Sequence, residues 1–290
     1  MPNSNVSRTT PETQEESHGG KGGQISTVEW VPPEGTLGEL VTAAWLRSSG
    51  SPLSIEHPAG SRPTSFAATL RRETIAVIAE VKRSSPSKGP INPTMDCAQQ
   101  AEAYTAGGAA AISVLTEPDR FGGRLADLTS VRSATGLPLL RKDFLVAESQ
   151  LAEAVSAGAS AALLIVRAIE PRRLAPLARF ADGIGLEILF EIRDETELSR
   201  ALDAGATIIG VNNRNLETLV IDSTTVERII PLIPRHCIAI AESGYTTRDQ
   251  VAGAGRAGAD AVLIGSSFSA SADPAEAVRA MTGVAKISRD

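Results

Sequence analysis

The 290-residue sequence contains few of the residue types that bind metals or form cross-links. Its two cysteines, Cys97 and Cys237, lie far apart, and its three histidines, His18, His57 and His236, are scattered along the chain. These spacings indicate neither a disulfide framework nor a zinc site. We therefore expect no metal, and we expect a protein of the reducing cytoplasm.

Aromatic residues make up 3% of the chain, and the formal net charge is −6. With few rings to stack on bases and no general basic charge, the chain is not expected to bind nucleic acid. No apolar run approaches the ~20 residues that a membrane-spanning helix needs, so no membrane partner is expected. The glycine-rich signatures of dinucleotide-binding and P-loop folds are absent too, which leaves dinucleotide and P-loop nucleotide binding without their usual support.

The chain divides into three predicted parts. Residues 1–25 are polar and lack the order of a secretory signal, so they predict a disordered tail without chemistry. Residues 26–73 predict an N-terminal helical extension. Residues 74–290 carry a repeated pattern and predict the catalytic domain.

The extension is expected to contain two helices. TLGELVTAAWLR, 36–47, offers Thr36 as N-cap with Glu39 three residues later, which is the pattern of a capping box. Its apolar residues recur at helical spacing and predict a buried stripe of Leu37, Leu40, Val41, Ala44 and Trp45. SFAATLRR, 65–72, predicts a short helix that leads into the first strand, and the segment between the two, 48–63, reads as a loop.

From residue 75 onward, short aliphatic runs alternate with helix-length amphipathic segments. Such runs predict parallel strands covered by helices, because each parallel crossover needs a helix and buries both faces of the strand. The runs start 22 to 35 residues apart. The eight predicted strands are 75–82, 110–116, 138–144, 162–166, 186–192, 208–213, 238–243 and 262–267.

Four of these strands follow a common phrase of small residues. The phrases are AGGAAAIS, AGASAALL, AGATIIG and AGADAVLIG. Their glycine suits the position just after a helix, where a left-handed backbone conformation ends the helix. Eight strand and helix units in about 200 residues predict a (β/α)8 TIM barrel, whereas an open doubly wound sheet usually has about five or six strands.

In such a barrel the carboxyl ends of the strands meet at one mouth, which holds the chemistry. Glu80 and Lys82 end the first strand and share one face, because they are two residues apart. A carboxylate and an ammonium keep each other ionised in a partly desolvated mouth. An ion pair without catalytic function explains these two residues equally well.

Two further strand ends favour anion binding. ESGY, 242–245, and IGSSF, 264–268, contain small residues that let backbone N–H groups approach a phosphate. Tight turns, with Ser266 as a helix N-cap, are the alternative. On the middle strands, Lys142 and Glu191 are the acid–base candidates, whereas Glu187 is expected to form a structural ion pair lower in the barrel.

Seven segments, each at a different strand end and in this order, resemble indole-3-glycerol phosphate synthase, an enzyme of tryptophan biosynthesis. They are IAEVKRSSPSKG, SVLTEPDRFGG, LPLLRKDFLVAESQ, LFEI, GVNNRNLETL, AESGY and LIGSS. The resemblance runs from about Phe66 to the C-terminus. It implies a carbon–carbon lyase that converts 1-(o-carboxyphenylamino)-1-deoxyribulose 5-phosphate to indole-3-glycerol phosphate, without metal or cofactor.

The resemblance also implies a role for each matching residue. Lys142 corresponds to the general acid, Glu191 to its acid–base partner, and Lys82 with Glu80 to a pair that positions the substrate and assists dehydration. Asn212 corresponds to the residue that holds a substrate hydroxyl. The phosphate cup would comprise Ser243, Gly244, Gly265 and Ser266, the other anion contacts Ser85 and Arg214, and the apolar wall for the aromatic ring Phe121, Phe144 and Leu163.

Some features depart from the family's usual pattern. Arg124 stands where serine is common, Asn215 stands where aspartate is common, and no lysine- and glutamate-rich helix is recognised before Phe66. Two other readings stay open, namely a phosphate-binding isomerase of the same pathway and a catalytically silent barrel used as a scaffold. For the synthase we expect a small phosphorylated substrate and a monomer or weak homo-oligomer.

Overall fold

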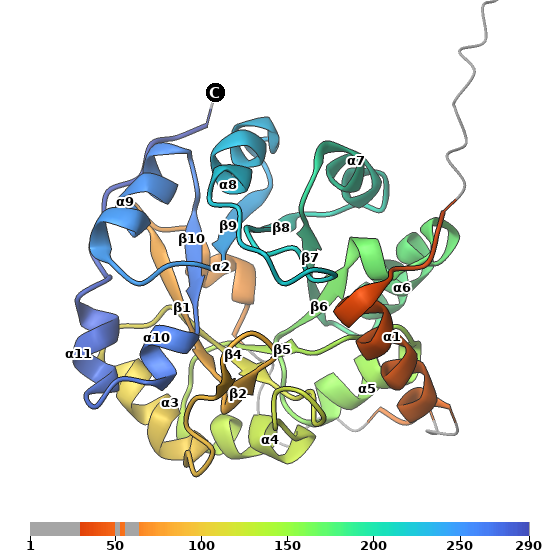
Figure 1. Ribbon diagram of the computed structural model, residues 1–290, viewed down its shortest axis with the longest axis horizontal. Coiled ribbons are helices and arrows are strands. Elements are labelled where there is room, and N and C mark those ends of the chain that lie inside the picture. Colours follow the sequence, from red (N-terminus) through yellow and green to blue (C-terminus); the bar gives the residue numbers. More distant parts are fainter. Residues whose placement is uncertain (1–29, 50–52, 56–63, 290) are drawn as a thin grey trace, which may run out of the picture. The chain divides into compact units, whose positions relative to one another are not determined.

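Eight parallel strands close into a barrel in the order β1-β10-β9-β8-β7-β6-β5-β4 (Figure 1). The computed structural model describes residues 30–49, 53–55 and 64–289, so the predicted tail lies outside the described residues. All eight predicted strands are confirmed to within two or three residues at each end. The barrel strands are β1 (Ala76–Val81), β4 (Ala111–Leu115), β5 (Leu139–Lys142), β6 (Ala161–Ile165), β7 (Glu187–Ile192), β8 (Ile208–Asn212), β9 (Ile238–Glu242) and β10 (Ala261–Ile264).

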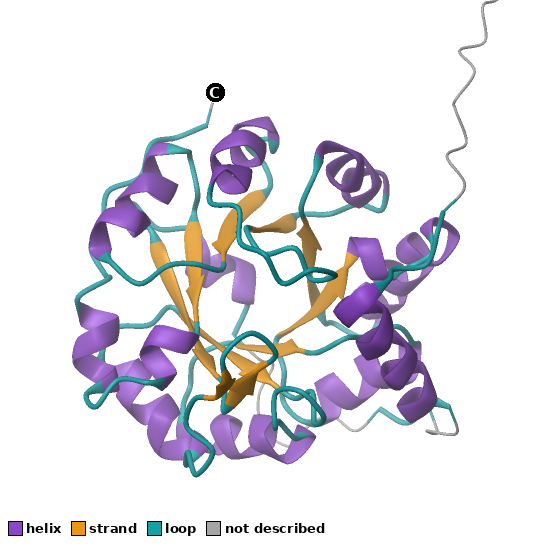
Figure 2. Ribbon diagram, in the orientation of Figure 1, coloured by secondary structure: helices purple, strands orange, loops and turns teal. Residues whose placement is uncertain are grey.

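Helices surround the strands, as the purple and orange ribbons of Figure 2 show. The connection after β1 also contains a small antiparallel pair of strands, β2 (Ser84–Ser85) and β3 (Gly89–Pro90). The helices after the strands are α3 (Cys97–Ala106), α4 (Leu125–Ala134), α5 (Glu148–Ser156), η1 (Val166–Ala168), α6 (Pro171–Gly183), α7 (Glu195–Asp203), α8 (Thr224–Ile229), η2 (Ile230–Leu232), α9 (Arg248–Arg256), α10 (Ser266–Ser269) and α11 (Pro274–Arg279).

The repeated small-residue phrases end helices, as predicted. Gly108, Gly158, Gly205 and Gly258 follow α3, α5, α7 and α9, and their φ angles lie between +85° and +94°. This left-handed conformation is available to glycine without steric cost, and it turns the chain back toward the next strand. The recurrence of the phrase therefore reflects the same turn made four times.

Two apolar clusters hold the barrel together. The larger cluster lies between the strands and the outer helices and includes Leu128, Leu177 and Val251. The smaller cluster fills the barrel interior, where Ile78, Leu140, Leu189 and Ile240 meet Phe66 and Leu70 of α2 (Phe66–Leu70). The predicted short helix is thus confirmed, and its two apolar side chains extend the barrel core.

Glu187, at the start of β7, holds α2 in place, and it forms no ion pair among the described residues, contrary to expectation. Its carboxylate accepts hydrogen bonds from the Ser65 hydroxyl (2.6 Å) and from the Ala67 N–H (2.8 Å). The first N–H groups of a helix have no intrahelical partner, and a carboxylate satisfies them well. Donors at the start of α2 are therefore the partners of the Glu187 carboxylate, where a cation was expected.

The predicted N-terminal helix is α1 (Gly35–Ser48), but Thr36 is not its N-cap. The cap is Glu34, which makes no side-chain capping bond. The Thr36 N–H donates to the main-chain carbonyl of Glu217 (3.2 Å), in the loop after β8. That carbonyl lies 2.5 Å from where a Cβ on Gly35 would be, so only glycine allows the approach. A tertiary contact thus replaces the local capping box.

The apolar stripe of α1 faces the barrel over most of its length. Its buried members are Leu37, Leu40, Val41 and Ala44. Trp45, which was predicted to belong to the stripe, has 41% of its surface exposed and lies under the guanidinium of Arg173. None of the helices in the described part of the chain is long and apolar enough to cross a membrane.

Asp260 closes the end of the barrel opposite the strand carboxyl ends. Its carboxylate contacts Lys286 Nζ (2.8 Å) and Arg289 Nη2 (3.0 Å) and accepts the Ala239 N–H (3.0 Å). Burial by itself raises the pKa of Asp260, but these partners outweigh burial and lower the pKa below its ordinary value. The ionised carboxylate therefore stabilises the folded chain.

Replacing Asp260 with Asn should lower the free energy of unfolding at pH 7 by about 1 to 3 kcal/mol, since charged hydrogen bonds are lost. A depressed carboxyl pKa stabilises the fold above the unfolded pKa of about 3.9, and this contribution disappears as pH falls through the folded pKa. Urea unfolding at pH 7 and pH 3 measures both effects. An equal loss at the two pH values would contradict the assignment.

Candidate active site

A cavity of about 300 Å³ lies at the carboxyl ends of the barrel strands. All fourteen residues predicted for the site line it: Glu80, Lys82, Ser85, Phe121, Lys142, Phe144, Leu163, Glu191, Asn212, Arg214, Ser243, Gly244, Gly265 and Ser266. They come from all eight strands or from the loops that follow them. Parallel strands end at one rim, which explains how residues 186 positions apart meet.

Lys142, the last residue of β5, lies between two carboxylates. Its Nζ is 2.9 Å from Glu191 Oε2 and 3.3 Å from Glu242 Oε2. Asn212 Nδ2 donates to the other oxygen of Glu191 (3.0 Å), and Asn212 Oδ1 accepts the Arg214 N–H (2.9 Å). Both oxygens of Glu191 are therefore engaged, and its carboxylate is held in one orientation toward Lys142.

Burial and neighbouring charges have opposite effects on the pKa of Lys142. Burial lowers the pKa of Lys142, but the carboxylates of Glu191, Glu242 and Glu80 outweigh it and raise the pKa above the ordinary lysine value. Burial raises the pKa of Glu242 to about 8, because Lys142 compensates it only in part and Glu191 adds a like charge. At neutral pH Lys142 is thus an ammonium, and Glu242 binds its proton more tightly than an exposed glutamate does.

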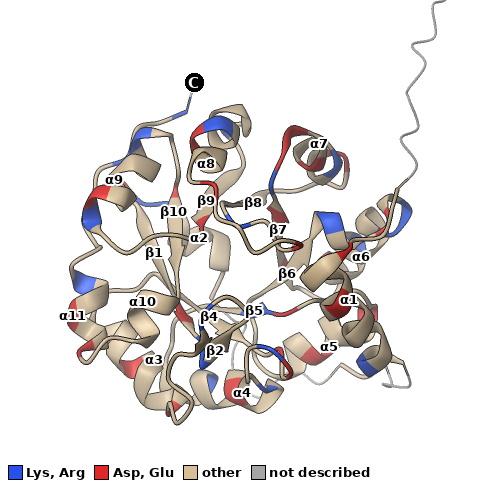
Figure 3. Ribbon diagram, viewed as in Figure 1, with Lys and Arg blue, Asp and Glu red and all other residues tan. Residues whose placement is uncertain are grey.

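The charges that line the cavity are nearly balanced. The cations are Lys82, Lys88, Lys142 and Arg214, and the acids are Glu80, Asp143, Glu191 and Glu242. Figure 3 shows that most other charged positions lie on the outer helices and loops.

Glu80 and Lys82 form the ion pair that their spacing predicted. Lys82 Nζ is 2.6 Å from Glu80 Oε1, and both side chains line the cavity. Gly265 leaves room for this pair, since a Cβ there would lie 2.2 Å from Glu80 Oε1 and 2.8 Å from Lys82 Nζ. Any side chain at position 265 would displace one of the two charged groups.

The turns after β9 and β10 bring main-chain atoms to the cavity. Ser243 and Gly244 both have positive φ, +67° and +91°, so the backbone reverses sharply where β9 ends. A serine in the left-handed region is uncommon and marks a local constraint on the backbone. Gly265 precedes α10, which starts at Ser266, and these four residues line the cavity.

Apolar side chains form the remaining wall. The Phe121 and Phe144 rings are tilted by 37° with centroids 6.2 Å apart, and Leu163 lines the same cavity. Ser85 has a buried hydroxyl with no hydrogen-bond partner among the described residues, so it is available to a ligand. Arg214 donates from Nη1 to the Leu219 carbonyl (2.8 Å) while it lines the cavity.

Sequence reasoning left further cavity residues out of the predicted site, among them Glu242, Leu40 and Leu216. Glu242 was noted only as a strand end, although its position as the last residue of β9 matches that of Lys142 on β5. Leu40 was assigned to helix packing alone, and Leu216 was not considered. Both line the cavity, so α1 and the loop after β8 contribute to its mouth.

Other polar strand-end residues face away from the cavity. Glu117 accepts hydrogen bonds from main-chain N–H groups of its own loop. Asn213 donates a hydrogen bond to the Ser243 carbonyl and accepts one from the Val226 N–H. Arg167 pairs with Glu217 at 2.9 Å. Across residues 30–49, 53–55 and 64–289, no three His, Cys, Asp or Glu side chains gather in a way that suits a metal ion.

The strand order defines a (β/α)8 barrel, and its cavity lies at the strand carboxyl ends, where enzymes of this fold carry their active sites. Among solved structures, a thiamine phosphate pyrophosphorylase from Pyrococcus furiosus is similar, with a TM-score of 0.55 over 73% of this chain and 95% of that one. Its sequence identity is 15%, so this likeness supports the barrel fold alone.

The family model of indole-3-glycerol phosphate synthase matches residues 42–281, and the chain belongs to this family. Indole-3-glycerol phosphate synthase 1 of Streptomyces coelicolor is 51% identical over 224 residues, which are 77% of this chain and 83% of that protein. The Streptomyces griseus enzyme is 52% identical over 73% of this chain and 78% of its own length. The match begins inside α1, so the similarity does not start near Phe66 as expected.

Replacing Glu242 with Gln should change how stability depends on pH. A carboxyl whose folded pKa is raised stabilises the fold below its unfolded pKa of about 4.3, and this contribution is lost as pH rises through the folded pKa, about 8. Stability of the wild type relative to the variant should therefore fall by more than about 1 kcal/mol between pH 5 and pH 9. Urea unfolding across this range measures it, and a constant difference would count against a raised pKa of Glu242.

Proposed function

We propose that this chain is an indole-3-glycerol phosphate synthase that acts in tryptophan biosynthesis by lysine and glutamate acid–base catalysis. Its substrate is 1-(o-carboxyphenylamino)-1-deoxyribulose 5-phosphate, which loses carbon dioxide and water as the indole ring closes. The observation that carries the proposal is the group of Lys142, Glu191 and Glu242 in a cavity that also holds the Glu80–Lys82 pair. Membership of the family supports the same reaction.

In the first step, the ring carbon that bears the carboxylate attacks the ketone carbon of the sugar chain. Lys142, an ammonium at neutral pH, donates a proton to the ketone oxygen as the carbon–carbon bond forms. The bond to the carboxylate then breaks, and its electrons restore the aromatic ring as carbon dioxide leaves. Glu191 and Glu242 keep Lys142 charged and aimed at the oxygen.

In the second step, the new hydroxyl leaves as water and a neighbouring carbon loses a proton. This step needs a donor and an acceptor within hydrogen-bond reach of the same intermediate. The Glu80–Lys82 pair and the Lys142–Glu191 pair lie on the same cavity and supply one of each. We assign the dehydration to these pairs together, with Asn212 holding Glu191 in its orientation.

The phosphate of the substrate is assigned to the turns after β9 and β10, where Ser243, Gly244, Gly265 and Ser266 line the cavity. Ser85 and Arg214 are assigned to the substrate anions. The aromatic ring is assigned to Phe121, Phe144 and Leu163, whose apolar surfaces line the cavity and favour a planar ring.

The direct test is to incubate the purified protein with the carboxyphenylamino-deoxyribulose phosphate in the presence of a chelator and to follow indole fluorescence. Formation of indole-3-glycerol phosphate supports the proposal. An isomerase of the same pathway would instead interconvert phosphoribosylanthranilate and this substrate, and a silent scaffold would do neither. Either result would overturn the proposal.

Replacing Lys142 with Ala should reduce kcat on the order of 10²-fold or more, the scale of one positioned general acid. Steady-state kinetics with the carboxyphenylamino-deoxyribulose phosphate measure the loss. The exposed Arg172, whose replacement with Ala should leave kcat unchanged, provides the control. A Lys142→Ala enzyme that stays within a few-fold of the wild type would remove Lys142 from the mechanism.

We also propose a cytoplasmic protein that is a monomer or a weak homo-oligomer, with the barrel domain beginning near residue 74. Cys97 and Cys237 are buried free thiols, as suits a reducing compartment. Sedimentation at micromolar concentration would measure the state of association.

A further inference from the structure

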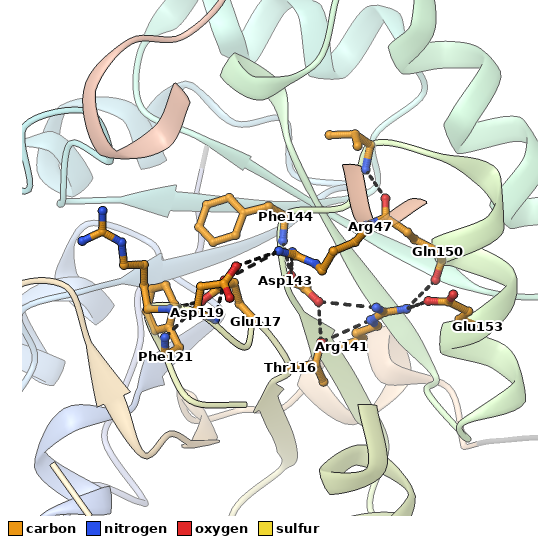
Figure 4. Close-up of polar contacts among 12 residues, drawn as sticks. Arg47, Thr116, Glu117, Asp119, Phe121, Arg141, Asp143, Phe144, Gln150 and Glu153 are labelled. Atoms are coloured by element: carbon orange, nitrogen blue, oxygen red, sulfur yellow. Dashed lines mark hydrogen bonds and ion pairs between the residues drawn. The ribbon is translucent and has the colours of Figure 1, made fainter. Parts of the chain in front are cut away.

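The C-terminal end of α1 contacts the barrel rim through one arginine. Arg47 Nη1 lies 3.4 Å from Asp119 Oδ2 and 3.8 Å from Glu117 Oε1, and its Nη2 lies 3.6 Å from Asp143 Oδ1 (Figure 4). These carboxylates belong to the loops after β4 and β5. A cation in the last turn also interacts favourably with the helix dipole, so α1 is a suitable element to present it.

Glu117 organises the loop that carries Phe121. Its side chain is fully buried, and its carboxylate accepts the main-chain N–H groups of Asp119 (2.9 Å), Arg120 (2.8 Å) and Phe121 (3.0 Å). Three donors on one carboxylate set the path of the loop from the end of β4 to Phe121. The direction of the Phe121 side chain therefore depends on where Glu117 is held.

Asp143 has the same relation to Phe144. Its Oδ1 accepts the Phe144 N–H (2.8 Å), while Oδ2 accepts the Thr116 hydroxyl (2.7 Å) and lies 3.4 Å from Arg141 Nη2. The side chain of Asp143 is only 4% exposed, so its charge needs compensation. Arg47 contacts Asp143 Oδ1, the oxygen that accepts the Phe144 N–H, whereas Arg141 contacts Asp143 Oδ2.

We propose that Arg47 is a positioning residue for the aromatic wall of the active site. Its guanidinium spans the two carboxylates that hold the main chain of Phe121 and of Phe144, and those two rings form the wall that faces the cavity (Figure 4). Docking of α1 thereby sets the spacing of the rings. The inference rests on the proposed function only for the identity of the ring that the wall receives.

Electrostatics explains why a cation is needed at this point. Glu117 and Asp143 are both buried and lie within reach of one guanidinium, so without it two like charges would face each other with less solvation than in water. Arg47 is 31% exposed, which makes each contact modest by itself. We therefore expect the loss of Arg47 to change the arrangement of the loops after β4 and β5 more than the global stability of the fold.

A second arginine provides a matched control for the docking of α1. The guanidinium of Arg173, on α6, lies 4.5 Å from the centre of the Trp45 ring. Trp45 is two residues before Arg47 on α1. The ion pair of Arg173 is with Glu148 (3.6 Å), and Arg173 touches neither Glu117 nor Asp143. Replacing Arg173 should loosen the same end of α1 without disturbing the carboxylates that hold the phenylalanines.

The first measurement is amide hydrogen exchange of the ligand-free protein, with Arg47→Gln and Arg173→Gln compared with wild type. We expect exchange at the Phe121 and Phe144 amides to accelerate on the order of tenfold in Arg47→Gln and to stay within twofold in Arg173→Gln. Arg47→Lys should restore part of the protection. If Arg47→Gln does not fold, Arg47→Lys against Arg173→Lys makes the same comparison.

The second measurement separates the aromatic wall from the phosphate site. In Arg47→Gln, KM for the carboxyphenylamino-deoxyribulose phosphate should rise on the order of tenfold, with kcat within about threefold of wild type, because ring binding is weakened. The inhibition constant of inorganic phosphate should not change. In Arg173→Gln, all three quantities should stay near wild type.

Equal exchange rates at the two amides in Arg47→Gln and wild type would overturn the inference, as would equal effects of the two arginine substitutions. A tenfold change in phosphate inhibition would also overturn it, since the disturbance would then extend beyond the aromatic wall. A wild-type protein that forms no indole product would refute the proposed function, but the exchange comparison would still decide whether Arg47 positions the phenylalanines.

Discussion

The site depends on one ammonium group held between carboxylates in the mouth of the barrel. Lys142 stays charged because Glu191 and Glu242 lie within 3.3 Å of it, and burial would otherwise lower its pKa. The neighbouring backbone leaves space for this arrangement. A Cβ on Gly210 would lie 2.0 Å from Glu242 Oε1, so a strand glycine is needed where the second carboxylate lies. The proposed proton donation follows from this packing.

The two ends of the barrel use charged residues for different purposes. At the closed end, Glu187 holds the first turn of α2 and Asp260 joins β9 to the C-terminal segment, and both stabilise the fold. At the open end, Glu80, Glu191 and Glu242 line a cavity instead. The acidic side chains are of the same chemical type, so their surroundings decide whether they stabilise the barrel or serve in chemistry.

Sequence reasoning predicted the eight strands and the fourteen cavity residues well, because strand patterns are local and the strands of a parallel barrel end at one rim. Its errors concern contacts between distant segments. Thr36 was expected to cap α1, but the carbonyl of Glu217 occupies that place. Leu40 was assigned to packing, although the position of α1 brings it to the cavity. The roles of the individual site residues stay predictions.

The sequence alone determined the number and order of the strands, the glycine turns that end four helices, and the presence of Lys82, Lys142 and Glu191 at strand ends. These properties depend on neighbours along the chain, whose spacing sets backbone conformation and strand face. Only the tertiary structure decided which carboxylate each lysine meets, and that Arg47 of α1 joins the loops of Phe121 and Phe144. Such pairings depend on distances between segments far apart in the chain, which residue spacing does not specify.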